Sequence, residues 1–140
     1  MCTYQDAFFV SLHVYCIIAR PLIIESPQPV TTTTERSVTF KCVAQGHPPP
    51  AISWKFKNTM VTNSNPNFNI SFTTRQDGRL DITTSYFGIY SVDSSMNGEV
   101  RCIATPPQRE EIGGLQIDSV SETAQLTVLG RPGHNEVMNV

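Results

Sequence analysis

Residues 41–56 read KCVAQGHPPPAISWKF and decide the fold class. Cys42 and Trp54 stand on either side of three consecutive prolines, which no helix can cross because proline lacks a backbone N–H and clashes with the preceding turn. On both sides of the prolines, apolar and polar residues alternate as in half-buried strands. The alternation places Cys42 and Trp54 on the inward side of their strands, so both face one core.

The same alternation recurs downstream. Inward positions are predicted for Val38, Phe40, Ala44, Ile52, Phe56, Phe87, Ile89, Val92, Val100, Cys102, Ala104, Ala124, Leu126 and Val128. Asp77-Gly78 predicts a tight hairpin between two strands, and Pro27 and Pro29 break an edge strand near the start. We therefore predict one all-β domain over residues 25–130, with residues 131–140 as a disordered tail or truncated linker.

Composition narrows the class of function. The chain has 140 residues, a formal net charge of -2 and a pI of about 5.9, and charged residues make up 16% of it. This length suits one domain with tails. No basic stripe is present that could neutralise phosphates, so nucleic acid is not expected as a partner.

The first 19 residues predict a signal peptide. Residues 7–19, AFFVSLHVYCIIA, form an apolar run of the length of a secretory h-region, with Ala19 next to the expected cleavage point. The preceding segment lacks Lys and Arg and carries Asp6, so a truncated gene model or a buried strand remains the alternative. Cleavage would leave Cys42 and Cys102 together in an oxidising compartment.

The short strands, the turn signals about every ten residues and the order Cys42, Trp54, Cys102 resemble an immunoglobulin domain. The stretch GHPPPAISW is similar to the turn between strands B and C in the intermediate set of that superfamily. The resemblance covers residues 25–130. It implies a two-sheet antiparallel sandwich with Greek-key topology, a Cys42–Cys102 disulfide between strands B and F, and Trp54 packed against that disulfide.

Two positions depart from the family pattern D-x-G-x-Y-x-C before the second cysteine. Gly98 and Cys102 match, but Met96 replaces the aspartate and Val100 replaces the corner tyrosine. The tyrosine-corner hydrogen bond and a salt bridge through that aspartate therefore cannot form. The chain is a divergent member, for which the variable set is the second choice.

Chemistry-bearing motifs are missing from the sequence. The four cysteines do not have zinc-ligand spacing, and His13, His47 and His134 belong to no recognisable catalytic arrangement. We expect no enzyme activity, metal, cofactor or small-molecule substrate, and we interpret His47 as an exposed turn residue. Asn69-Ile70-Ser71 is a glycosylation sequon, of a kind that such a composition produces about once by chance.

The segment between strands F and G is longer than a minimal turn. Gly113-Gly114 between Ile112 and Leu115 predicts a hairpin tip, so residues 109–115 would form a finger beyond the sandwich. Apolar residues at an exposed tip suggest partner contact, with the charges of Arg109, Glu110 and Glu111 setting orientation. The alternative is that the apolar residues fold back onto the domain.

These observations predict an extracellular recognition or adhesion module that binds a cell-surface or matrix protein, homophilically or heterophilically. The chain would be secreted, or a fragment of a longer receptor, because no bilayer-spanning run follows the domain. The alternative is an intracellular muscle-type module in a filament or scaffold, whose cysteines would be reduced.

Replacing both Ile112 and Leu115 by Ser tests the finger. If their side chains contact a partner rather than the domain, the melting temperature should change by only a few degrees, while binding or self-association weakens by about 1–2 kcal/mol. A large drop in melting temperature would place these side chains against the domain instead.

Overall fold

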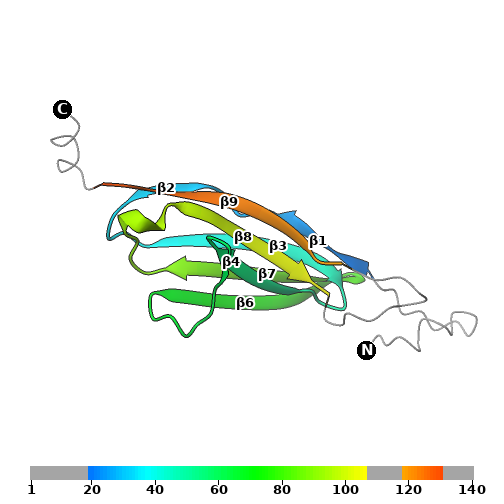
Figure 1. Ribbon diagram of the computed structural model, residues 1–140. Helices are drawn as coiled ribbons and strands as arrows, with labels where there is room; N and C mark the ends of the chain where they lie inside the picture. The colour runs from blue at the N-terminus through cyan, green and yellow to red at the C-terminus, as the bar shows by residue number, and fades with distance from the viewer. Residues whose placement is uncertain (1–18, 107–117, 131–140) are drawn as a thin grey trace, which may run out of the picture.

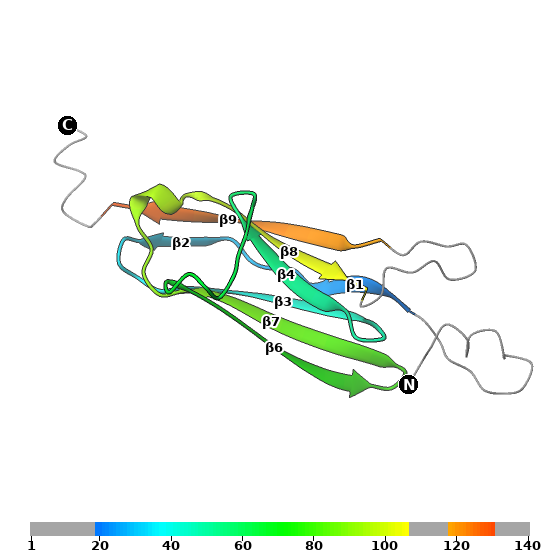
Figure 2. The ribbon, with the colours of Figure 1, turned by 60° about the horizontal axis from the view of Figure 1, so that its bottom comes forward.

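The computed structural model describes residues 19–106 and 118–130, which form nine strands in two packed sheets (Figures 1 and 2). The first sheet has the order β1 (Ala19–Glu25), β3 (Val38–His47), β7 (Leu80–Ile89), β6 (Phe68–Asp77). The second has the order β2 (Val30–Thr33), β9 (Val120–Leu129), β8 (Gly98–Thr105), β4 (Ala51–Phe56), β5 (Thr59–Met60). The predicted all-β sandwich is confirmed, and the pairing of β3 with β7 and of β4 with β8 is consistent with Greek-key connections.

The segment that the sequence predicts as one broken edge strand forms two strands in different sheets. β1 pairs antiparallel with β3, whereas β2 pairs in parallel with β9. Pro27 and Pro29, which cannot donate to a ladder, lie between the two strands. The chain changes sheets at this point, and the second sheet consequently contains one parallel pair. β1 begins at Ala19, before the predicted domain start at residue 25, and the rest of the predicted signal peptide lies outside the described residues.

A covalent bond joins the two sheets at the centre of the core. Cys42 of β3 and Cys102 of β8 form a disulfide with a Cα–Cα distance of 6.5 Å, and both residues are fully buried. Nearly every inward position that the alternation predicts is buried, and Ile52 is partly buried against the same core. Because the disulfide closes a loop of 60 residues, it stabilises the domain by about 4 kcal/mol in the chain-entropy model.

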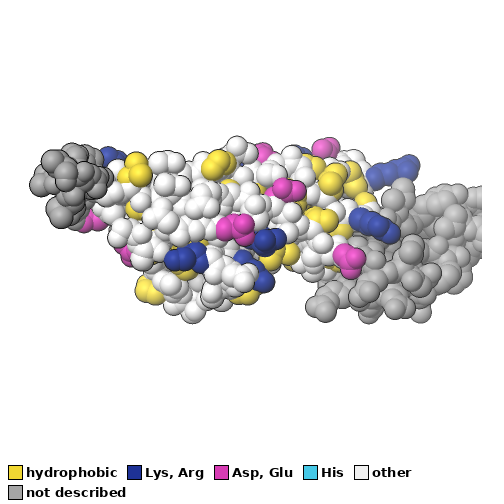
Figure 3. All heavy atoms as spheres, turned by 45° about the horizontal axis from the view of Figure 1, so that its top comes forward, with side chains coloured by type: hydrophobic (Ala, Val, Ile, Leu, Met, Phe, Trp, Pro, Cys, Tyr) yellow, Lys and Arg dark blue, Asp and Glu magenta, His cyan; other side chains and the backbone are white. Residues whose placement is uncertain are grey.

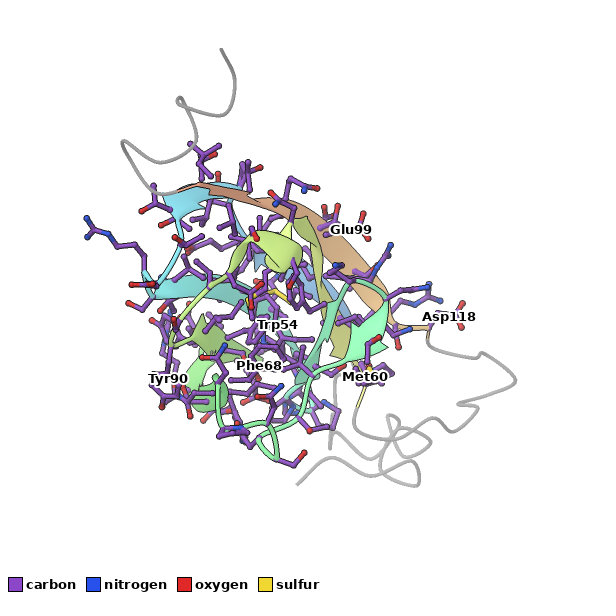
Figure 4. All side chains as sticks on the ribbon, turned by 60° about the vertical axis from the view of Figure 1, so that its left-hand side comes forward. Trp54, Met60, Phe68, Tyr90, Glu99 and Asp118 are labelled. Carbon is purple, nitrogen blue, oxygen red and sulfur yellow. A yellow bond between two sulfur atoms is a disulfide. The ribbon has the colours of Figure 1, made fainter. Side chains whose placement is uncertain are left out.

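Trp54 lies beside this disulfide and contributes a second link between the sheets (Figure 4). The ring centroids of Trp54 and Phe87 are 5.7 Å apart. The ring of Phe87 also packs edge-on against that of Phe68, with a centroid distance of 5.3 Å. The indole Nε1–H of Trp54 donates to the Ser85 hydroxyl at 3.0 Å, and that hydroxyl donates to the carbonyl of Ser71 at 3.0 Å. Trp54 and Ser85 are both fully buried. These two hydrogen bonds therefore satisfy the polar N–H group that the indole carries into the core.

The turn before β8 is held without the tyrosine and the aspartate that the family pattern places there. The Asn97 side chain accepts from Val128 N–H at 2.7 Å and donates to the carbonyls of Val128 and Ser94. Val100 is fully buried and fills the core with apolar surface in place of the tyrosine ring. Asn97 thus ties this turn to β9 through backbone hydrogen bonds, a substitute that the sequence pattern did not reveal.

A short 3₁₀ helix, η2 (Ser94–Met96), completes the same turn. Asp93 caps it by accepting hydrogen bonds from the hydroxyl and the backbone N–H of Ser95. These bonds to the charged form lower the pKa of Asp93 below its ordinary value. Lys57 reaches the same helix and donates to the Ser95 carbonyl at 2.8 Å, with its stem lying over Gly98.

Two tight turns connect the long strands. Lys57 and Asn58 both have positive φ, as in a type I′ turn between β4 and β5. Gly78, at φ 63°, lies in the predicted hairpin between β6 and β7, in which Asp77 pairs with Leu80. Glycine adopts this conformation without a steric penalty, which explains the Asp-Gly signal.

The interpretation of His47 as an exposed turn residue is wrong. His47 is the last residue of β3, its side chain is 26% exposed, and its Nδ1 lies 2.7 Å from Asp81 Oδ2. The register of β3 and β7 pairs Gly46 with Asp81, so the sheet itself brings the two side chains together. Because the two residues are 34 positions apart, no local pattern in the sequence indicates this pair.

The Trp54–Ser85 bond predicts a specific energetic coupling. Replacing Ser85 by Ala would leave a buried indole N–H without its partner, so the free energy of unfolding should fall by about 1–3 kcal/mol. In a Trp54→Phe background, which has no indole N–H, the same substitution should cost clearly less. Urea unfolding of the four proteins measures both costs, and equal costs in the two backgrounds would contradict the coupling.

Candidate protein-binding surface

The outer face of the second sheet carries the candidate binding surface. Because Trp54 and Cys102 point inward, their sequence neighbours on β4 and β8 point outward. The register places Met60, Lys55, Arg101 and Thr123 in one row across β5, β4, β8 and β9. We call this surface the β4–β8 face; it consists of Ser53, Lys55, Met60, Glu99, Arg101 and Ile103.

Arg101 is held in place at the middle of the β4–β8 face. Its guanidinium lies 3.2 Å from Glu99 Oε1 and donates to the Ser121 hydroxyl at 3.0 Å. The side chains of Arg101 and Glu99 are 39% and 53% exposed, so the pair adds little to stability. An oriented guanidinium retains further N–H donors for a partner and loses less entropy when it binds one.

Met60 supplies apolar area to the same face. It is 50% exposed on the two-residue edge strand β5, opposite Lys55. Figure 4 shows Met60 and Glu99 on one side of the sandwich and Trp54 inside it. From the side of β2 and β9, Figure 3 shows acidic and basic side chains interspersed with hydrophobic ones. A flexible apolar side chain among fixed charges is the composition of many protein interfaces.

The predicted finger, with Arg109, Glu110, Glu111, Ile112, Gly113, Gly114 and Leu115, lies outside the described residues. The structure describes both of its attachment points. β8 ends at Thr105 and β9 begins at Val120, and the Ser119 hydroxyl donates to the Thr105 hydroxyl at 3.1 Å. The segment for which the finger is predicted therefore connects two strands of the sheet that carries the β4–β8 face.

Asn69, the predicted glycosylation site, belongs to the other sheet. It is exposed on β6 and points to the outer face, beside Gly88 of β7. Its neighbour Phe68 points inward and contacts the aromatic core. The structure therefore leaves the Asn69 side chain accessible.

Residues 19–106 and 118–130 hold no group of three or more His, Cys, Asp or Glu side chains that could bind a metal ion. They also contain no helix long and apolar enough to cross a membrane.

Residues 20–106 match the family model described as immunoglobulin domain. The chain belongs to this family. Its immunoglobulin domain carries the disulfide and tryptophan that the resemblance implied, at Cys42, Cys102 and Trp54.

Two curated proteins are similar in sequence. The chain is 32% identical over 125 residues to the Homo sapiens "Peroxidasin homolog". This alignment covers 88% of this chain and 7% of that protein. It is 30% identical over 112 residues to "Cell adhesion molecule Dscam1" of Drosophila melanogaster, covering 80% of this chain and 5% of that protein. The immunoglobulin domain therefore spans only a small part of the length of these relatives.

Solved structures show the same fold. The N-terminal eight immunoglobulin domains of Down Syndrome Cell Adhesion Molecule align with a TM-score of 0.66 at 29% identity, covering 81% of this chain and 13% of that one. The titin domains z1z2 in complex with telethonin align with a TM-score of 0.65 at 22% identity, covering 83% and 51%. The identity to titin supports a shared fold only.

Proposed function

We propose that this immunoglobulin domain is an extracellular recognition module that binds a protein partner through the β4–β8 face and the predicted finger of residues 109–115. The observation that carries the proposal is the buried Cys42–Cys102 disulfide. Disulfides form and persist in secreted and cell-surface proteins, whereas the cytosol keeps thiols reduced. The predicted signal peptide and the similarity to a cell adhesion molecule support the same compartment.

The β4–β8 face supports protein binding in particular. Lys55 and Arg101 place two cationic groups beside the apolar Met60, and Glu99 orients one of them. Interfaces use apolar anchors and arginine for affinity and charges for orientation. A muscle-type filament module would share the fold, but its thiols would be reduced, so the oxidation state in the cell separates the two functions.

Secretion and glycosylation test the compartment. Full-length chain expressed in eukaryotic cells should enter the medium without its first ~19 residues and with Cys42 bonded to Cys102 in non-reduced peptides. Asn69 should carry glycan, so glycosidase treatment should increase gel mobility, and Asn69→Gln and Ser71→Ala should both abolish that shift. Retention in the cytosol with free thiols would favour the filament module.

Substitutions on the β4–β8 face test the binding site. Met60→Ser combined with Arg101→Ala should weaken staining of partner-bearing cells by the labelled full-length chain about 5- to 30-fold, because the apolar anchor and the oriented guanidinium of the proposed contact are both lost. The matched control is Tyr86→Ser combined with Lys41→Ala on the outer face of the other sheet, where both side chains are also exposed. Equal loss in both variants would mean that the β4–β8 face is not the site.

A further inference from the structure

β6 is an unprotected edge over half of its length. It is the outermost strand of the first sheet and pairs only with β7 among the described strands (Figure 2). All seven residues from 71 to 77 are exposed. On the same side of the sandwich, the second sheet ends in β5, which has only two residues and leaves this part of β6 uncovered. An exposed strand edge of this kind is a template for pairing with another strand.

The first half of the edge is closed by the chain itself. Phe68 N–H donates to the Asn65 carbonyl at 3.0 Å. Two residues on, Ile70 N–H donates to Asn63 Oδ1 at 2.8 Å, and Asn63 Nδ2 donates back to the Ile70 carbonyl at 3.4 Å. The Asn63 side chain thus takes the place of a neighbouring strand and ends any further pairing at Ile70.

The second half of the edge has no such cover from the described residues. In an antiparallel pair, alternate residues turn both backbone groups to the same edge. Because Ile70 faces the free edge, Phe72, Thr74 and Gln76 face it too, with three N–H donors and three carbonyl acceptors. No hydrogen bond within the described chain uses these six groups. Phe72 is 68% exposed, more than any other large hydrophobic side chain described.

We propose that a second copy of this chain pairs with this open segment, antiparallel, about a two-fold axis at Thr74. The segment is bounded by the Asn63 cap at Ile70 and by the turn at Gly78, and Thr74 is its midpoint. In this register Thr74 pairs with Thr74 of the second copy, and Phe72 pairs with Gln76 of the second copy. All six open groups of each copy then form hydrogen bonds. The paired segment ends before Ile70 in both copies, so neither strand overlaps the Asn63 side chain of the other copy.

The side chains fit this register. On the outer face, Asp77 lies opposite Ser71 of the second copy and Arg75 opposite Thr73, so no like charges meet directly. Arg75 and Asp77 of one strand already lie 3.9 Å apart. On the inner face, pairing covers part of Phe72. Asn69 lies outside the paired segment, so a glycan there does not occupy the edge.

The contact is small, so association is weak. A single strand edge buries less area than a standard interface, and we expect a Kd between about 10 µM and 1 mM. Such contacts become effective where many copies are held close together, as on a surface. The edge lies on a different sheet from the β4–β8 face, and the inference does not depend on the proposed function.

Charge substitution at the two-fold axis tests the register. Thr74→Lys places two lysines opposite each other, and Thr74→Glu places two glutamates there, so each variant alone should self-associate at least ~10-fold more weakly than the natural chain. An equimolar mixture of the two should associate again, because lysine then meets glutamate. Sedimentation equilibrium of the full chain up to about 1 mM measures all three.

Matched controls separate edge pairing from general adhesion. Phe72→Ser should weaken association, whereas Leu22→Ser on β1, at the other edge of the same sheet and 53% exposed, should not. A natural chain that is monomeric at the highest concentration, or Lys and Glu variants that associate as the natural chain does, would overturn the proposal.

Discussion

The disulfide between Cys42 and Cys102 is the constraint on which the rest of the structure depends. It ties β3 of one sheet to β8 of the other and sets the position of the core that Trp54 and Phe87 fill. Its stabilisation of about 4 kcal/mol is a large share of the 5–15 kcal/mol that typical domains possess. The bond also makes stability depend on the redox compartment, which links the interior of the domain to its proposed extracellular role.

Around this link, buried hydrogen bonds join segments of the core. Ser85 receives the indole N–H of Trp54, and Thr83 donates to the carbonyl of Pro50 at 2.8 Å. Each bond crosses between segments that are distant in sequence and specifies one relative position of the sheets. Asn97 does the same for the turn before β8, where Val100 contributes only packing. The lost tyrosine corner is thus replaced by an amide that bonds the backbone of β9.

The sandwich leaves two different kinds of surface. The β4–β8 face presents side chains, with an oriented Arg101 beside the apolar Met60. The open half of β6 presents backbone groups, which pair with any strand of suitable register. The β4–β8 face suits recognition of a specific partner, because its side chains differ in shape and charge from one position to the next. Weak self-association suits the second, because its geometry is symmetric about one residue.

The sequence by itself determined the all-β fold class, most of the core and the two cysteines that form the disulfide. Alternation of period two assigns the face of each residue, and the spacing of Cys42, Trp54 and Cys102 matches one known sandwich. Local pattern also indicated the hairpin at Asp77-Gly78, because only a few residues adopt positive φ there.

Only the tertiary structure decided how these strands are arranged. Alternation cannot say which sheet a strand joins, so the separation of β1 from β2 and the parallel pairing of β2 with β9 were not predictable. Val43 alternates with the inward residues Cys42 and Ala44 and so points away from the core, yet it is only 7% exposed because it lies in an inner strand between β1 and β7. The Asn63 cap on Ile70 and the open edge beyond it likewise arise from contacts between segments that no local pattern connects. Side-chain burial depends on all neighbours in three dimensions, whereas the sequence pattern reports only those along the strand.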